Sequence, residues 1–155
     1  MGYYMKFIKG YAQITTSMEK LLKKDTKFVW IEDCQRSLDM LKEKMVTAPI
    51  LVFPDWSKEF HVHVYASSIA LVVLAQQGEG DIDHPMEFSS RNLSTAENNY
   101  TTTKREVLAM VYALQKYRHY LLGGHFKMYT DHSALRYIVN KPVLGWRICR
   151  WLLLF

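Results

Sequence analysis

The chain has 155 residues, of which 49% are hydrophobic and 23% charged, and its formal net charge is +5. This length suits one domain, or one domain with an appended segment, and the apolar content is enough to fill a core. No apolar run is long enough to span a bilayer and the start lacks the pattern of a signal peptide, so we expect an intracellular protein of the cytoplasm or nucleus without membrane contact. Cys34 and Cys149 lack metal-ligand spacing, which favours buried, reduced thiols.

Positive charge is concentrated in the last third of the chain. Residues 107–155 contain seven Lys and Arg against one acid, Asp131, whereas residues 1–106 have a net charge of −1. Aromatic residues lie between these cations, a pattern that suits the phosphate backbone of a nucleic acid. Charge alone does not separate this interpretation from an ordinary solvated face of Lys and Arg side chains, and both stay open.

Helical periodicity dominates the first third. Apolar residues at helical spacing predict one amphipathic helix or two short ones over 3–22, followed by a polar break at 23–27. A second helix is predicted over 32–46, where Cys34, Leu38, Leu41 and Met45 recur every three or four positions. Pro49 is expected to end this helix, because proline cannot continue one.

The period then changes from helical to alternating. Phe60, Val62, Val64 and Ala66 alternate with other residues and predict a half-buried strand. An apolar run over 69–76 suits a paired strand, a turn follows at 78–81, and 86–90 predicts a short third strand. Three strands joined by short turns predict an antiparallel meander.

A capping box at Ser94-Thr95-Ala96-Glu97 predicts the start of a long helix that runs to about Leu121. Its expected apolar stripe consists of Val107, Leu108, Val111 and Leu114. Residues 126–130 predict a fourth strand, and a helical crossover should make it parallel to the first. Further helices are expected at 133–139 and from 146 onward.

This order of elements resembles the RNase H fold, an α/β class with a mixed sheet. Six strings are similar, in the same order, to strings of the RNase H domain of gypsy-type LTR retrotransposon Pol polyproteins: 28–30, 48–51, 89–94, 96–100, 117–121 and 129–132. The resemblance implies the helical tail of a reverse transcriptase region at 1–24, a connecting helix and loop at 25–57, and an RNase H-like domain at 58–155 that lacks its last strand and helix.

The resemblance also implies an activity: cleavage of the RNA strand of an RNA–DNA hybrid by four acids that hold two Mg²⁺ (or Mn²⁺) ions. Two such ions, about 4 Å apart, activate a water and stabilise the leaving oxygen. By resemblance, Asp131 takes the place of the family's strand-four aspartate and Glu106 that of its helix glutamate. The pattern alone would also allow Asp131 as the N-cap of a following helix and Glu106 as an ordinary exposed helical acid.

The first-strand acid of the family is replaced in this chain. The family string is Val-Asp-Ala-Ser, whereas this sequence has Val64-Tyr65-Ala66-Ser67. A phenol is uncharged near pH 7 and offers one oxygen, so it cannot bridge two magnesium ions. The family's fourth acid would lie beyond Phe155. We therefore predict weak metal binding and impaired or absent cleavage; the alternatives are a non-catalytic nucleic-acid-binding module and a non-functional relic of a mobile element.

Weaker candidates for contact with the nucleic acid are Tyr100, Arg118, Lys127 and His132, each equally plausible as a solvated or packing residue. His61 and His63 share a strand face with Tyr65, but alternation on a half-buried strand is a commoner explanation than a metal pair.

Two features of the strands bear on the sheet. Compared with the family, the run over 70–76 lacks a glycine and one residue, a change that reverses the faces of a strand unless a bulge absorbs it. Without a last strand, 125–130 is expected to be an open sheet edge through which the chain could self-associate.

Overall fold

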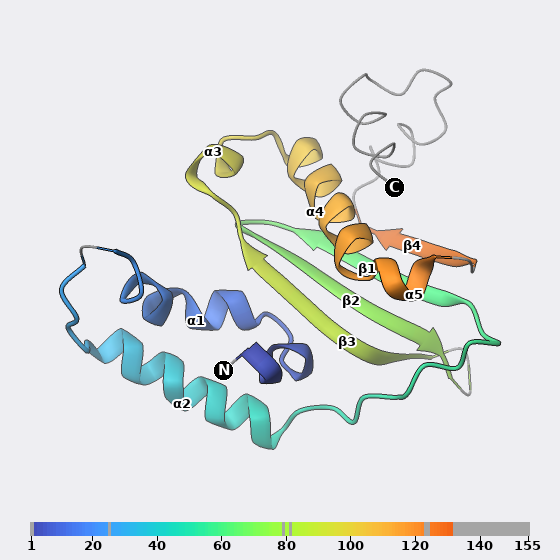
Figure 1. Cartoon of the computed structure of the whole chain (residues 1–155), viewed down its shortest axis with the longest axis horizontal. Helices are drawn as coiled ribbons and strands as arrows, with labels where there is room; N and C mark the ends of the chain where they lie inside the picture. Colours follow the sequence, from blue (N-terminus) through green and yellow to red (C-terminus); the bar gives the residue numbers. More distant parts are fainter. Residues whose placement is uncertain (1, 25, 79, 81, 123–124, 132–155) are drawn as a thin grey trace.

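The computed structural model describes residues 2–24, 26–78, 80, 82–122 and 125–131. Its elements form a mixed sheet with helices on both faces (Figure 1), which confirms the predicted fold class. In chain order they are η1 (Gly2–Phe7), α1 (Tyr11–Lys20), α2 (Glu32–Val46), β1 (Phe60–Ala66), β2 (Ile69–Gln77), β3 (Asp83–Asn92), α3 (Thr95–Asn98), α4 (Thr102–Lys116), α5 (Arg118–Leu121) and β4 (Phe126–Thr130). Within these described ranges, no helix has the length and apolar character needed to cross a bilayer.

The sheet has the strand order β3-β2-β1-β4. The predicted meander is confirmed, because β2 pairs antiparallel with both β1 and β3. The crossover prediction is also confirmed: β4 runs parallel to β1, with Phe60 opposite Phe126 and Val64 opposite Thr130. Since parallel strands point the same way, β1 and β4 both end at the edge of the sheet near the start of α4 (Figure 1).

The main core lies between the sheet and α4. Alternate residues of β1 and β2 are fully buried there, including Val62, Val64 and Leu74. Ala109 and Ala113 are the fully buried residues of α4, and their small side chains allow the helix backbone to lie close to the strands. The predicted stripe named larger residues of α4, but Leu108, Val111 and Leu114 are only partly buried.

The predicted long helix is three separate helices. The capping box is present: the Ser94 hydroxyl accepts a hydrogen bond from the backbone N–H of Glu97 at 3.2 Å, and Glu97 accepts one from the Ser94 N–H at 2.8 Å. It begins the one-turn helix α3, while a second cap, Thr101, accepts a bond from Lys104 N–H and begins α4. Hydroxyl side chains that bind nearby backbone groups favour such interruptions.

The strand β3 is longer than predicted and begins at Asp83 rather than at residue 86. Pro85 lies inside it, which a sheet tolerates at an edge strand because proline has no N–H to donate. The β2–β3 register shifts between Leu74 and Ala75, a β-bulge, whereas the β1–β2 pairing continues unbroken. β2 is buried on both faces along nearly its whole length.

The segment 3–22 forms the two short helices η1 and α1, and these pack with α2 around a second cluster built on Ile8, Tyr11 and Leu41. α1 lies against β3, on the face opposite α4, with the Ala12 N–H donating to the Ser90 hydroxyl at 2.9 Å. The N-cap of α1 is Gly10 with φ 73°, a left-handed conformation that glycine adopts without steric cost.

Candidate functional site

Glu106 is buried between α4 and the sheet and is only 3% exposed. Its Oε1 accepts a hydrogen bond from the backbone N–H of Ala66 at 3.2 Å, and its Oε2 accepts one from the Thr130 hydroxyl at 3.4 Å. The carboxylate therefore joins α4 to the last residues of both β1 and β4. The alternative of an exposed helical acid is wrong, because the Glu106 side chain points at the sheet.

Tyr65 lies on the face of β1 opposite the core under α4, and Asp131 follows β4 at the same edge of the sheet. Val64 pairs with Thr130 as the last pair of this register, and Asp131 directly follows β4 in the chain. The Tyr65 side chain is 40% exposed, Asp131 is also exposed, and Lys9 Nζ lies 5.9 Å from the centroid of the Tyr65 ring. The three predicted positions thus meet at the carboxyl ends of β1 and β4.

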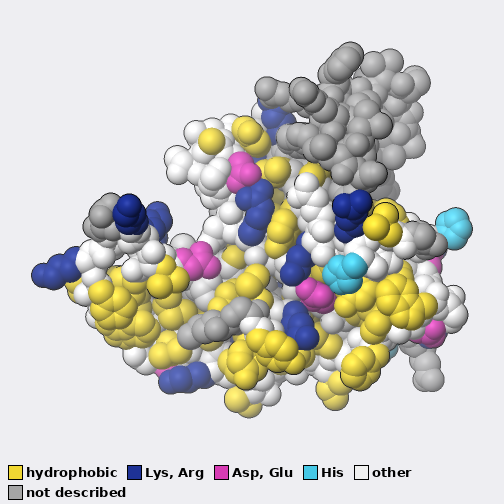
Figure 2. Space-filling view, in the orientation of Figure 1, with side chains coloured by type: hydrophobic (Ala, Val, Ile, Leu, Met, Phe, Trp, Pro, Cys, Tyr) yellow, Lys and Arg dark blue, Asp and Glu magenta, His cyan; other side chains and the backbone are white. Residues whose placement is uncertain are grey.

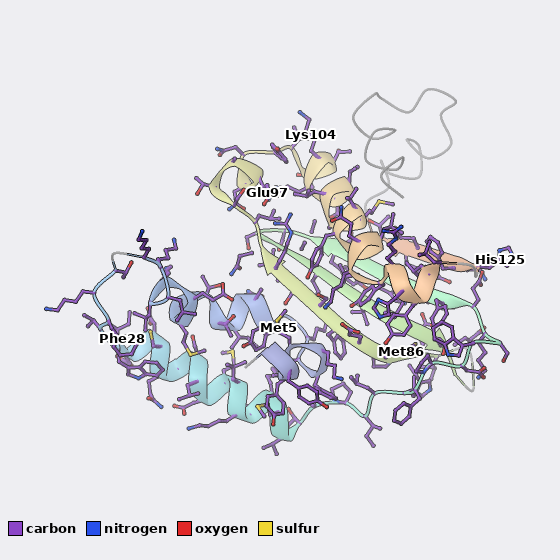
Figure 3. All side chains as sticks on the ribbon, in the orientation of Figure 1. Met5, Phe28, Met86, Glu97, Lys104 and His125 are labelled. Atoms are coloured by element: carbon purple, nitrogen blue, oxygen red, sulfur yellow. The ribbon has the colours of Figure 1, made fainter. Side chains whose placement is uncertain are left out.

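Figure 3 orients this edge of the molecule. Lys104, at the start of α4, and Glu97, in α3, are labelled beside the edge where β1 and β4 end, whereas His125 is labelled at the opposite end of the sheet. We call the edge marked by Tyr65, Glu106, Thr130 and Asp131 the carboxyl edge. The first turns of α4 therefore lie over this edge.

The residues present at the carboxyl edge do not fit a site for two magnesium ions. Within the described part of the chain, no group of three or more His, Cys, Asp or Glu residues is placed to hold a metal ion. Both carboxylate oxygens of Glu106 already accept hydrogen bonds. Tyr65 supplies a phenol where a pair of metal ions would need a carboxylate that bridges them.

An arginine lies close to this edge and was not predicted. Arg105 Nη1 donates a hydrogen bond to the Ser67 carbonyl oxygen at 2.9 Å, directly after β1. Its Nε is buried and has no hydrogen-bond partner among the described residues. The guanidinium therefore brings a positive charge close to the carboxyl edge. The spacing of charged residues along the helix does not reveal this position.

The weaker nucleic-acid candidates are not all brought together. Tyr100 precedes α4 near the carboxyl edge and is 38% exposed, whereas Arg118 is exposed beyond the opposite end of that helix. Lys127 Nζ lies 2.6 Å from Glu59 Oε2, and this hydrogen bond raises the pKa of Lys127. His132 and the helix that Asp131 would cap lie outside the described residues.

The histidines of β1 share a carboxylate that the sequence did not predict. Asp83 Oδ1 lies 2.7 Å from His61 Nδ1, Asp83 Oδ2 lies 2.6 Å from His63 Nε2, and the Tyr129 ring stacks on His63 at 4.8 Å between centroids. Burial opposes ionisation of Asp83, but the hydrogen bonds from His63 and His61 outweigh it, so the pKa of Asp83 lies below its usual range. Two histidines spaced by two on one strand face were the available signal.

Comparison with protein families identifies the fold and its relatives. The family described as an RNase H-like domain found in reverse transcriptase matches residues 55–155. The Pol polyprotein of transposon 297 from Drosophila melanogaster is 40% identical and aligns with 97% of the chain, which covers 14% of that protein. The Tf2-3 polyprotein of Schizosaccharomyces pombe is 32% identical, again over 97% of the chain and 12% of that protein.

Solved structures agree with this assignment. A foamy viral protease–reverse transcriptase dRH in complex with double-stranded DNA superposes with a TM-score of 0.80 at 18% identity, over 97% of this chain and 28% of that one. The foamy viral protein in complex with an RNA/DNA hybrid gives a TM-score of 0.74, also at 18% identity, over 97% and 21%. At 18% identity, these superpositions establish the fold alone. Because the family match covers well over half of the sequence, this chain belongs to the RNase H-like domains found in reverse transcriptase and is similar to that part of retrotransposon Pol polyproteins.

Proposed function

We propose that this chain is an RNase H-like domain that binds nucleic acid but cleaves the RNA strand of RNA–DNA hybrids weakly or not at all. By descent it would be a Mg²⁺-dependent endonuclease of a gypsy-type Pol polyprotein. The observation that carries the proposal is Tyr65, which occupies the position of the family's first-strand aspartate at the edge where β1 and β4 end.

The chemical reason is the charge at that position. In a two-ion site one carboxylate must contact both metals, because its two oxygens can each bind one ion and its charge offsets theirs. The phenol of Tyr65 has one oxygen and is uncharged at neutral pH. Because Tyr65 replaces a carboxylate, we expect Mg²⁺ to bind weakly beside Glu106 and Asp131 and not to support in-line hydrolysis.

Binding of nucleic acid does not depend on that charge. Net positive charge over residues 107–155 and Arg105 at the carboxyl edge both support attraction of a phosphate backbone. The foamy viral proteins of the same fold are described in complex with double-stranded DNA and with an RNA/DNA hybrid. We propose the same class of ligand for this chain, with binding retained where cleavage is lost.

Replacement of Tyr65 tests the proposal. The unaltered chain should show no Mg²⁺-dependent cleavage of a labelled RNA–DNA hybrid. A Tyr65→Asp variant should be assayed in a chain extended at its C-terminus by the sequence that follows the matched region of the transposon 297 polyprotein. It should cleave at least about a hundredfold faster than the same extended chain with Tyr65, because restored electrostatic stabilisation of a reacting phosphate is worth that much or more.

A matched control is Tyr65→Asn in the same extended chain, which is polar and similar in size to aspartate but uncharged, and which should stay inactive. Clear metal-dependent turnover by the unaltered chain would overturn the proposal. Equal activity of the Asp and Asn variants would show that charge at position 65 is not what limits cleavage.

A further inference from the structure

A stripe of polar residues lies along α1, where Gln13, Thr16 and Lys20 share one side of the helix, and it continues in the sequence to Lys9 and Lys23. Lys9, Gln13, Thr16, Lys20 and Lys23 follow one another at intervals of four and three residues, the spacing that places side chains on one side of a helix. Lys9 precedes α1 and Lys23 follows it. Residues 1–24 contain five lysines and one acid, Glu19, so this segment is strongly basic although residues 1–106 as a whole are not.

Most of this stripe forms one wall of a groove beside the carboxyl edge. The groove has a volume of about 370 Å³ and is lined on the α1 side by Gln13, Thr16, Glu19, Lys20 and Lys23. The other wall is formed by residues that follow β1 and end β3, together with one residue of α3: Ser68, Ile69, Asn92, Leu93 and Asn98. It thus lies between the N-terminal helices and the RNase H-like sheet.

The charges in the groove are unevenly engaged. Glu19 accepts hydrogen bonds from the Thr15 hydroxyl at 2.8 Å and from Asn92 Nδ2 at 3.0 Å, so its carboxylate is held against the sheet. Lys20 and Lys23 are exposed and make no ion pair within the described part of the chain. Figure 2 shows Lys and Arg side chains gathered at the end of the molecule where α1 leads into α2.

The groove and the carboxyl edge adjoin each other. Ser68 follows β1 by two residues, and Lys9, at the other end of the stripe, lies with its Nζ 5.9 Å from the Tyr65 ring centroid. A nucleic-acid strand at the carboxyl edge would therefore have a cation near each end of α1, Lys9 before the helix and Lys20 at its last position.

We propose that this groove binds the phosphate backbone of the nucleic acid that occupies the carboxyl edge, with Lys20 and Lys23 as the cations and the side chains of Ser68 and Asn98 as hydrogen-bond donors. The inference rests on the proposed binding of nucleic acid and adds a contact outside the RNase H-like sheet. It gives the helices before the sheet a part in holding the ligand, independent of the metal site.

The test is the salt dependence of binding to a fluorescein-labelled RNA–DNA hybrid, measured by anisotropy without metal. Each phosphate contact contributes about −0.9 to the slope of log affinity against log salt concentration. A Lys20→Gln/Lys23→Gln variant should lower the steepness of that slope by about 1.8 and weaken binding roughly tenfold to sixtyfold at about 0.1 M salt. A Lys20→Arg/Lys23→Arg variant should keep the original slope.

The matched control is Lys42→Gln/Lys58→Gln, which removes the same charge from an exposed position of α2 and from the loop before β1. It should change the slope by less than half as much. If both double variants change the slope equally, the groove makes no specific contact and the inference fails while the proposed function stands. If the unaltered chain binds no hybrid at low salt, the proposed binding function fails and the inference fails with it.

Discussion

At the scale of single residues, Glu106 has a structural duty that is separable from any catalytic one. Its two oxygens accept bonds from Ala66 N–H and from the Thr130 hydroxyl, and the side chain is buried. Removing it by Glu106→Ala leaves those donors without an acceptor, which should lower the free energy of unfolding by about 1–3 kcal/mol. Glu106→Gln keeps one acceptor oxygen and should lose less, as measured by urea denaturation.

The comparison of these two variants is informative in both directions. If Glu106→Ala is as stable as the unaltered chain, the carboxylate does not hold the strand ends together and its burial has another cause. If Glu106→Gln loses as much stability as Glu106→Ala, the charge rather than the acceptor oxygen holds the contact, since glutamine retains an acceptor but not the charge.

Asp83 makes the stability of the sheet depend on pH. Hydrogen bonds from His63 and His61 hold the pKa of Asp83 below its usual range in the folded chain. A group with a lowered folded pKa stabilises fully above its unfolded value, near 3.9, and loses that contribution as pH falls through the folded value. Asp83→Asn should therefore lower the free energy of unfolding by about 1–3 kcal/mol at pH 7, and the difference should shrink below about pH 4.

The charged groups facing the histidines include Glu59, whose Oε2 lies 3.8 Å from His61 Nε2, so the experiment needs a control that leaves this cluster intact. Asp39→Asn on α2 removes an exposed carboxylate and should change stability little at any pH. A difference between Asp83→Asn and the unaltered chain that stays constant from pH 7 to about pH 3 would contradict the argument.

At the scale of elements, the capping box of α3 joins it to β3 through Arg91. Arg91 donates to both carboxylate oxygens of Glu97 at 3.0 and 2.8 Å, and these bonds together with the Ser94 N–H lower the pKa of Glu97 to about 2. Its stabilisation is present above the ordinary value near 4.3 and is lost as pH falls toward that folded pKa. Glu97→Gln should cost about 1–2 kcal/mol at neutral pH, measured by thermal or urea unfolding.

Ser94→Ala provides the comparison, because it removes the cap but leaves the ion pair, and it should cost about 1 kcal/mol at any pH. The stability loss of Glu97→Gln should change between about pH 2 and 5, whereas that of Ser94→Ala should stay constant. If the loss of Ser94→Ala changes with pH as steeply as that of Glu97→Gln, the cap and the ion pair cannot be separated.

The elements also show what periodicity can and cannot predict. Strands β1 and β4 and helix α2 have the predicted bounds because each has one clear period and a sharp end signal, such as Pro49 after α2. The split between α3 and α4 was missed because Ser94 and Thr101 are both good N-caps. A sequence pattern does not say which of the two begins the long helix. Ala109 and Ala113 were missed as core residues because apolar patterns favour large side chains.

The candidate site followed a similar division. Resemblance located Glu106, Asp131 and the replaced Tyr65, since these belong to local strings, and the sheet register brings them to one edge. Asp83 was missed because its contact with His61 and His63 reaches across β2 from a position expected to be in a loop. Such contacts depend on strand order and on the start of β3, which local periodicity does not determine.

At the scale of the whole molecule, two hydrophobic clusters are separate, and β3 lies between the helices that cover them. The main core lies under α4, the second lies among η1, α1 and α2, and β3 contacts both groups of helices through its two faces. Ser89 and Ser90 show this directly, since the first binds the Tyr112 hydroxyl of α4 and the second the Ala12 N–H of α1. Polar contacts near the end of β3 therefore take part in attaching the N-terminal helices to the sheet.

Those contacts can be removed without touching either core. Asn92 Nδ2 donates to the Ala12 carbonyl at 3.2 Å and to Glu19 at 3.0 Å, while Ser90 accepts from the Ala12 N–H. A Ser90→Ala/Asn92→Ala variant should lose about 1–3 kcal/mol of docking free energy. Amide hydrogen exchange in α1 and α2 should then accelerate by roughly tenfold to a hundredfold, while β1 and β2 keep their protection.

A Gln35→Ala control removes polar contacts that stay within α2 and the residues before it, so exchange in α1 should not change. Equal acceleration in α1 and in the sheet of the double variant would mean that both clusters unfold as one unit, and the division into two parts would be wrong. Selective acceleration would place the weakest joint of the molecule between α1 and β3, the two walls of the groove that we propose for phosphate, and bound hybrid should then slow exchange in α1 again.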